Sequence, residues 1–276
     1  MKERTVDEQR ITVEGQELAY TWSEGQDRPV IFVHGNSSSS RTWHGVMTGP
    51  FGRRFHCLAF DLPGHGASAR AGNPGDYSLP GYARTLTGFA QATEATDAVI
   101  VGWSLGGHIA LEAAPGLPTA AGYVVFGTPP VSTMAQMAEA FLPNPAMNVG
   151  FAAVVSPQDA RTYAASFTAP GSALPLDDFV ADIERTDGEA RAGLFASVVE
   201  GRFADQVAVA ESLGQPLAIL QGEGEQLVSL DYLQKLTIPP LWRGTVQVIP
   251  NAGHALHQEA PEAFAALLAD FIADLP

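Results

Sequence analysis

Short apolar runs separated by turn residues recur through the first half of the chain and return near its end. Apolar runs of this length, without alternation, indicate strands that are covered on both faces, as in a parallel sheet. Helical spacing of apolar residues predicts helices over 82–91 and over 261–273. The predicted buried strands are 30–33, 56–60, 99–101, 123–126, 216–220 and 246–249.

The first strands differ from these, because residues 11–13 and 17–22 each keep a polar face and are typical of a hairpin. Beyond the hairpin, strands alternate with helices up to residue 126. Such alternation predicts an α/β fold with a doubly wound, mostly parallel sheet and right-handed crossovers. A length of 276 residues suits one large domain that carries an inserted subdomain.

The alternation stops at about residue 131. Several helical stretches rich in Ala, Met and Phe then follow one another up to residue 200 without a convincing apolar strand. A long excursion without strands is uncommon unless it has a function, so we predict a helical lid over the active site. The predicted boundaries are 132–212 for the lid and 1–131 with 213–276 for the core. An additional packing layer is the alternative to a lid.

A Gly-x-Ser-x-Gly sequence at 102–106 stands between the apolar run 99–101 and an apolar helical pattern. A strand that turns sharply into a helix places Ser104 at the tip of the turn, with its hydroxyl clear of the sheet. The N-terminus of the helix then points at whatever bonds to that hydroxyl. We therefore predict that Ser104 is a nucleophile. The alternative is an ordinary glycine-rich turn with a solvated serine.

A nucleophilic serine needs a base. His254 is the best candidate, because it lies on a loop between the last apolar strand and the terminal helix, and His257 is its nearest rival. The remaining histidines either stand beside glycines at turns and helix starts or have no identifiable partner. They are His34, His65 and His108 in the first group and His44 and His56 in the second.

The base needs an acid to orient it, and we expect this acid to follow strand 216–220. Glu223 and Glu225 are both available there, and Asp231 stands further along. Glu225 is the preferred candidate, because it lies beyond the strand-ending Gly222 in a loop that a further glycine makes flexible. A solvated acidic turn is the alternative.

Two backbone amides are predicted to stabilise an oxyanion. One belongs to Leu105, directly after the nucleophile, and the other to Asn36, in the turn after strand 30–33. No histidine cluster or cysteine pair has metal-ligand spacing, and the glycines do not form a dinucleotide fingerprint. The sequence therefore predicts neither a metal nor another cofactor.

The net charge of −15 opposes binding to nucleic-acid phosphates and to anionic lipid surfaces. No apolar run is long enough to predict a membrane span, and residues 1–10 lack the apolar core of a signal peptide. The single Cys57 excludes an internal disulfide. We therefore expect a cytoplasmic protein whose partner is a small-molecule acyl substrate. Whether it is a monomer or a homodimer stays open.

Across nearly its whole length the chain resembles the α/β-hydrolase superfamily. The chain order serine, acid, histidine is that of α/β-hydrolases, and other general marks are 61–68 and Gly253-His254. The chain is most similar to the serine-dependent N-acylhomoserine lactonases, which are quorum-quenching enzymes. The more telling stretches are 34–39, 102–109, 127–131, 185–191 and 251–255, followed by Glu259-Ala260-Pro261.

This resemblance implies that the triad acid is a glutamate at the position of Glu225. It also implies that Asn36 and a lid tyrosine, matched by Tyr163, contact the substrate, and Trp103 beside the nucleophile is a further predicted contact. Much of the lid departs from the family pattern, so the preferred acyl chain length is not predicted. The lid residues predicted to contact the acyl chain, or else to pack the lid, are Met134, Met137, Phe141, Met147, Phe151 and Phe167.

The sequence thus predicts a serine hydrolase that opens the lactone ring of N-acylhomoserine lactones through an acyl-enzyme. A general carboxylesterase, or an acylase that cuts the amide of the same molecule, is the alternative within catalysis. A non-catalytic ligand-binding protein of the same fold is a third interpretation, and the intact set of Ser104, Glu225 and His254 argues against it.

Overall fold

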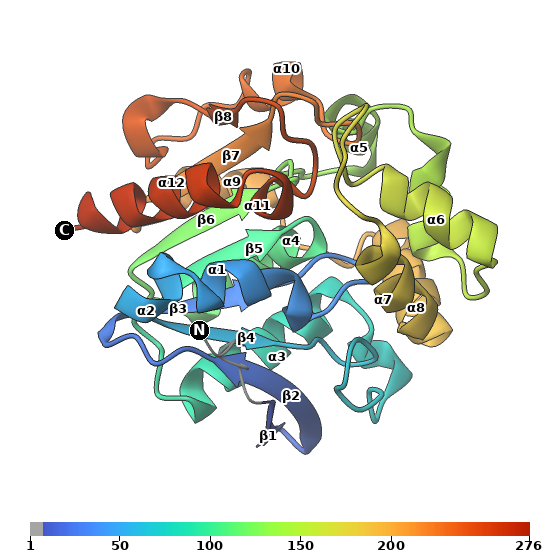
Figure 1. Cartoon of the computed structure of the whole chain (residues 1–276), viewed down its shortest axis with the longest axis horizontal. Coiled ribbons are helices and arrows are strands. Elements are labelled where there is room, and N and C mark those ends of the chain that lie inside the picture. The colour runs from blue at the N-terminus through green and yellow to red at the C-terminus, as the bar shows by residue number, and fades with distance from the viewer. Residues whose placement is uncertain (1–7) are drawn as a thin grey trace.

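The computed structural model describes residues 8–276, so most of the charged N-terminal segment considered above lies outside the described residues. Its centre is one eight-stranded sheet with the order β1-β2-β4-β3-β5-β6-β7-β8 (Figure 1). The hairpin strands are antiparallel, and the strands from β4 to β8 run parallel. The bounds are β1 (Gln9–Val13), β2 (Gln16–Trp22), β3 (Asp27–Val33), β4 (Phe55–Phe60), β5 (Val99–Trp103), β6 (Gly122–Phe126), β7 (Leu217–Gly222) and β8 (Gln247–Ile249).

The predicted α/β class and mostly parallel sheet are confirmed. Strands β5 and β6 are buried along their whole length, which explains why their sequences are apolar without alternation. Several strands extend beyond the apolar runs that predicted them. In β3, for example, Asp27 already pairs with Phe55, and an irregularity separates this pair from the regular pairing that starts at Val30.

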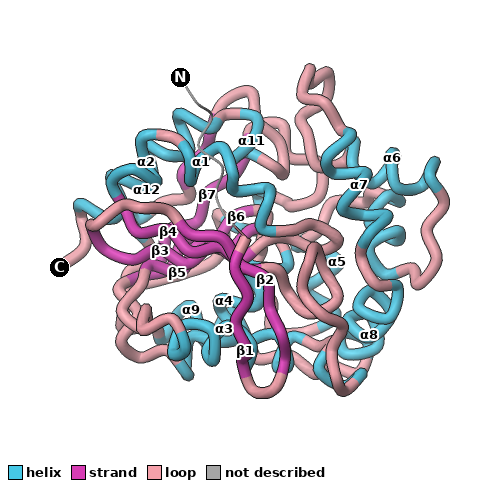
Figure 2. The backbone as a smooth tube through the Cα atoms, turned by 60° about the horizontal axis from the view of Figure 1, so that its bottom comes forward, coloured by secondary structure: helices cyan, strands magenta, loops and turns pink. Residues whose placement is uncertain are grey.

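Helices cover both faces of this sheet. Figure 2 shows α1, α2 and α12 on one side of the strands and α3, α4 and α9 on the other. The predicted helix 82–91 begins earlier, because Ser78 caps its first turn by accepting a hydrogen bond from the Gly81 N–H at 3.1 Å. The bounds are α1 (His44–Thr48), α2 (Pro50–Arg54), α3 (Leu79–Ala92), α4 (Leu105–Ala113), α9 (Gln206–Ser212), α10 (Leu230–Leu233), α11 (Leu256–Glu259) and α12 (Pro261–Ala273).

Four further helices lie together at one end of the sheet, on the right in Figure 1, where the parallel strands have their carboxyl ends. They are α5 (Met134–Ala140), α6 (Pro157–Ala165), α7 (Asp177–Arg185) and α8 (Gly188–Val199). The last helix of the predicted lid segment, α9, instead packs against α4 beside the sheet. The division of the chain into a core and a lid at 132–212 stays a proposal.

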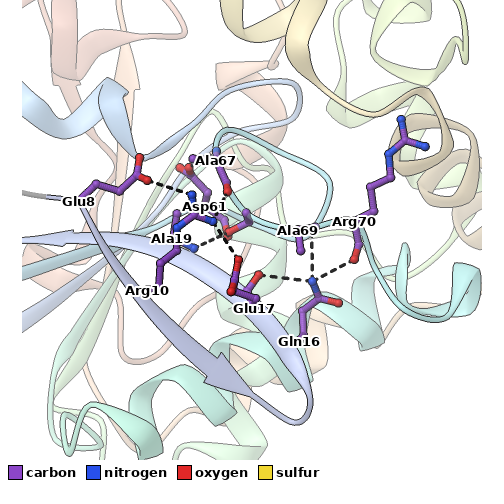
Figure 3. Close-up of polar contacts among 10 residues, drawn as sticks. Glu8, Arg10, Gln16, Glu17, Ala19, Asp61, Ala67, Ala69 and Arg70 are labelled. Atoms are coloured by element: carbon purple, nitrogen blue, oxygen red, sulfur yellow. Dashed lines mark hydrogen bonds and ion pairs between the residues drawn. The ribbon is translucent and has the colours of Figure 1, made fainter.

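The N-terminal hairpin holds the loop that follows β4 (Figure 3). Arg10 donates to the Ala67 carbonyl at 2.7 Å, and Gln16 donates to two further carbonyls of the same loop. The buried Asp61 carboxylate accepts the Ala67 N–H at 2.7 Å and the Ser40 N–H at 2.6 Å. Asp61 therefore ties the loop after β4 to the loop after β3, and both border the carboxyl edge of the sheet.

Within residues 8–276, no helix combines the length and the apolar character that crossing a bilayer requires.

Candidate active site

Ser104 occupies a strained turn between β5 and α4. Its backbone has φ 53° and ψ −118°, a conformation that costs a residue other than glycine about 1–3 kcal/mol. Two glycines make the turn possible: a Cβ on Gly102 would overlap the backbone of Gly106, and a Cβ on Gly106 would overlap the Val33 carbonyl. The Thr128 hydroxyl donates to the Ser104 carbonyl at 2.8 Å and holds the turn from the next strand. The sharp strand-to-helix turn that the sequence predicted is therefore present.

His254 and Glu225 form a buried pair. The Nδ1 of His254 lies 2.8 Å from Oε2 of Glu225, and the two side chains are 2% and 3% exposed. The other carboxylate oxygen accepts the Leu227 N–H at 2.7 Å, so both oxygens of Glu225 are held. A carboxylate only accepts hydrogen bonds, so Nδ1 carries a proton, and in the neutral imidazole Nε2 then presents a lone pair. This Nε2 is buried and has no hydrogen-bond partner among residues 8–276.

The structure distinguishes the three carboxylates that the sequence offered as partners of the base. Glu223 is exposed and accepts a hydrogen bond from the Asn251 N–H at 3.2 Å, and Asp231 is exposed at the start of α10. Glu225 is the one whose carboxylate contacts His254. His257, the other candidate for the base, is also buried, and its Nε2 lies 2.6 Å from the Thr42 hydroxyl.

A glycine stands where an acid following β6 would have to be. Gly127 has φ 59°, and a Cβ built on it would meet the ring of His254. A side chain of any size there would displace the imidazole. The acid therefore reaches His254 from the loop after β7.

Glu259 fixes the loop that carries His254, and the sequence analysis did not assign it this role. Its carboxylate accepts the Gly253 N–H at 2.6 Å and the Ala169 N–H at 3.0 Å. The Ala255 N–H in turn donates to the Phe167 carbonyl at 2.6 Å. The loop of the catalytic histidine candidate is thus bonded to the segment between α6 and α7. The signal in the sequence was a glutamate two residues before Pro261, which begins the terminal helix.

The two predicted oxyanion donors lie on neighbouring loops of the sheet edge. Leu105 is the first residue of α4, so its N–H has no acceptor within the helix. Asn36 follows β3, which is the strand beside β5. The side chain of Asn36 donates to the Gly150 carbonyl at 2.6 Å, which uses one of the two N–H groups of Nδ2.

A cavity of about 380 Å³ opens above Ser104 and His254, and Asn36, Leu105 and Tyr163 also line it. Its remaining wall is mostly apolar and comes largely from the helices at the carboxyl end of the sheet. Of the predicted acyl-chain contacts, those in the wall are Met134, Met137, Phe141, Met147 and Phe151.

Trp103 and Phe167 are not part of this wall. Trp103 is 1% exposed, and its ring lies 5.7 Å from that of His254 and 5.5 Å from that of Phe167, which itself stacks 5.9 Å from His254. The two aromatic rings therefore pack against the imidazole and do not face the cavity. The substrate contacts predicted for them gain no support from this position.

Tyr163 lies close to Gly150, with its hydroxyl beside the Gly150 backbone. A Cβ on Gly150 would meet both the Tyr163 hydroxyl and Nδ2 of Asn36, so these two polar groups are close to each other. Burial raises the pKa of Tyr163 well above its usual value. The phenol is therefore neutral at ordinary pH and able to donate a hydrogen bond.

The other buried histidines have structural partners. His34 donates from Nδ1 to the Gly35 carbonyl at 2.8 Å and accepts the Leu62 N–H at 3.0 Å, and burial lowers its pKa to about 4. Burial likewise lowers the pKa of His65 to about 3. Both rings are therefore neutral pieces of the loops that frame the site.

A model of the α/β hydrolase family matches residues 30–267. The chain therefore belongs to the α/β hydrolase family. Among the solved structures that it resembles are those of the N-acyl homoserine lactonase AidH, which is 35% identical to it with TM-scores of 0.92 to 0.93. These matches cover 98% of this chain and 97% or 98% of AidH. AidH or its variants were crystallised with N-hexanoyl homoserine lactone, N-hexanoyl homoserine and N-butanoyl homoserine.

Curated relatives carry out different reactions. The 2-(acetamidomethylene)succinate hydrolase of Mesorhizobium japonicum is 28% identical, over 98% of this chain and 94% of its own. A 2-succinyl-6-hydroxy-2,4-cyclohexadiene-1-carboxylate synthase of an Enterobacter species is 30% identical, over 88% and 91%. An uncharacterised Mycobacterium tuberculosis protein is 34% identical over 107 residues, which cover 39% of this chain and only 30% of that protein. Membership of the family therefore does not define which substrate is bound or which bond of it is cut.

Proposed function

We propose that this protein is a serine hydrolase that opens the lactone ring of N-acylhomoserine lactones. One observation carries the proposal: the buried His254–Glu225 pair and Ser104 stand at the floor of an apolar cavity, with Asn36 and Tyr163 at its side. The apolar wall suits an acyl chain, and the two polar groups suit the amide beside it. The likeness to AidH over nearly the whole chain supports this substrate class.

In the proposed reaction His254 Nε2 takes the proton of Ser104 as the serine oxygen attacks the lactone carbonyl. The ring carbon–oxygen bond then breaks, and the ring oxygen takes the proton from His254. The resulting alcohol stays on the acyl group that Ser104 now holds. Water then attacks this ester while His254 takes one of its protons. The bond between the acyl carbon and the Ser104 oxygen breaks, His254 gives the proton to that oxygen, and N-acylhomoserine is released.

The protein groups around the reacting carbon supply the remaining stabilisation. The N–H groups of Leu105 and Asn36 donate to the oxyanion, and each donor lowers the activation barrier by about 3–4 kcal/mol. The Glu225 carboxylate keeps the proton on Nδ1 and stabilises the imidazolium. Acyl-chain carbons on the cavity wall add about 0.8 kcal/mol of binding for each buried methylene.

Tyr163→Phe tests how the substrate amide is held. We expect kcat/KM for N-hexanoyl homoserine lactone to fall about tenfold, because the phenol would no longer donate to the substrate amide. The kcat/KM for p-nitrophenyl acetate should change little, because this ester has no amide for Tyr163 to hold. The hydrogen bond to the amide aligns only the lactone substrate. Equal losses on the two substrates would show that Tyr163 acts on packing or on the triad instead.

The same site chemistry would also serve a carboxylesterase or an acylase, so the bond that is cut must be measured. Ring opening produces one new carboxylic acid and no amine, whereas cleavage of the amide releases homoserine lactone with a free amine. We expect acid release without amine release from N-hexanoyl homoserine lactone. Stoichiometric amine release would reassign the enzyme as an acylase, and hydrolysis of simple esters alone would reduce the proposal to an esterase.

A further inference from the structure

His108 is a polar residue on the mostly apolar wall of the cavity, and the proposed reaction does not use it. It follows Ser104 by one turn of α4, as the hydrogen bond from the His108 N–H to the Ser104 carbonyl at 3.2 Å shows. This bond spans one helical turn, so the two backbones lie about 5–6 Å apart along the helix axis. Both residues line the same cavity, where the His108 ring packs 6.2 Å from that of Phe141.

The proton position on this ring is fixed by Gln206. The Nδ1 of His108 lies 2.8 Å from Oε1 of Gln206, and an amide oxygen only accepts, so Nδ1 carries a proton. Gln206 is fully buried, and its Nε2 lies 3.5 Å from the His108 carbonyl. This contact of the amide nitrogen favours the orientation in which Oε1 faces Nδ1.

The other ring nitrogen is therefore an acceptor. Burial is the main reason that the pKa of His108 is lowered to about 4, and the neighbouring His254 acts in the same direction, so the ring is neutral at pH 7. In a neutral imidazole with a proton on Nδ1, Nε2 presents only a lone pair. This Nε2 makes no hydrogen bond to any residue in the described part of the chain, and its ring borders the cavity.

The spacing places this acceptor beside one carbon of the proposed substrate. In an N-acylhomoserine lactone the third carbon of the acyl chain lies five bonds from the attacked carbonyl, about 6 Å in an extended chain. That span matches the one-turn separation between the backbones of Ser104 and His108, whose side chains both line the cavity. We propose that His108 is a specificity-determining residue that accepts a hydrogen bond from a hydroxyl on the third acyl carbon. The inference rests on the proposed lactone substrate.

The substituent on the third acyl carbon decides whether Nε2 of His108 receives a hydrogen bond. A 3-hydroxyl donates to Nε2 and satisfies it. An unsubstituted chain leaves Nε2 unpaired in an apolar cavity, and a 3-oxo group turns its own lone pairs toward that of Nε2. The expected order of kcat/KM is therefore 3-hydroxyacyl above unsubstituted above 3-oxoacyl, with about three- to tenfold between the first two.

The test measures kcat/KM for N-decanoyl, N-(3-hydroxydecanoyl) and N-(3-oxodecanoyl) homoserine lactone on the wild type and on His108→Leu. We expect the 3-hydroxyl preference to fall to about onefold in His108→Leu, while the unsubstituted substrate is still turned over. In His108→Gln, whose amide both donates and accepts, the penalty against the 3-oxo chain should shrink while the 3-hydroxyl preference remains. The matched control Met137→Leu alters the same cavity wall without a polar atom and should keep the wild-type order.

Equal turnover of the three substrates by the wild type, or a 3-hydroxyl preference that persists in His108→Leu, would overturn this role of His108 and leave the lactonase proposal intact. A preference for the 3-oxo chain would overturn it too, since Nε2 would then be a donor. No turnover of any lactone by the wild type would contradict the proposed function and this inference with it.

Discussion

Ser104→Ala is expected to abolish turnover while the protein stays folded. Removing the nucleophile of a serine hydrolase lowers kcat by a thousandfold or more, and the residual rate comes from binding and from the oxyanion donors. The strained turn should survive, because its shape is set by the close approach of Gly102 and Gly106 to neighbouring backbone. Turnover of N-hexanoyl homoserine lactone and the thermal unfolding midpoint together measure this result.

His254→Ala and the double variant make this test more specific. Residues that act as one unit have losses that do not add, so the double variant should be about as slow as either single variant. A serine-directed phosphonylating reagent should add to wild-type protein at Ser104 and leave Ser104→Ala unmodified. A folded Ser104→Ala protein that keeps more than about one per cent of the wild-type rate would refute the nucleophile assignment.

Glu225→Gln has the second largest expected effect. The glutamine presents an amide where Nδ1 of His254 now finds a carboxylate, so the imidazole takes the wrong tautomer or turns away. A change of this kind lowers kcat by about ten-thousandfold in the serine protease that defines the triad. We expect a loss of the same order here, measured as kcat on the lactone.

The matched control is Glu223→Gln, two residues earlier in the same loop. Its side chain is exposed and accepts a hydrogen bond from the Asn251 N–H, which a glutamine oxygen can also accept. This variant should keep kcat within about twofold, as surface changes away from the site usually do. A large loss in Glu223→Gln together with a small one in Glu225→Gln would move the role of the acid to Glu223.

Features that depend on local sequence could be predicted. The buried strands are continuous apolar runs, and the serine turn is set by glycines within a few residues of Ser104, so β5, α4 and their junction follow from short stretches. The pairing of Glu225 with His254 was also accessible, because parallel strands bring the loops at their carboxyl ends to one edge.

Contacts between distant segments could not be predicted in the same way. Nothing near Asn36 in the sequence indicates that its side chain donates to Gly150, more than a hundred positions away. Trp103 stands beside the nucleophile in sequence, yet strand alternation turns its ring behind His254 instead of into the cavity. The roles of Glu259 and Gln206 likewise arise only when separate loops and helices pack together.

The central claim is that the ester bond of a lactone ring is cut, and product mass in ¹⁸O-water tests it most directly. Wild-type protein incubated with N-hexanoyl homoserine lactone should yield one product that is heavier than the substrate by one water and carries the ¹⁸O in its new carboxyl group. Acidification should then close the ring and restore the lactone. A label found in free hexanoic acid, with unlabelled homoserine lactone beside it, would contradict the account.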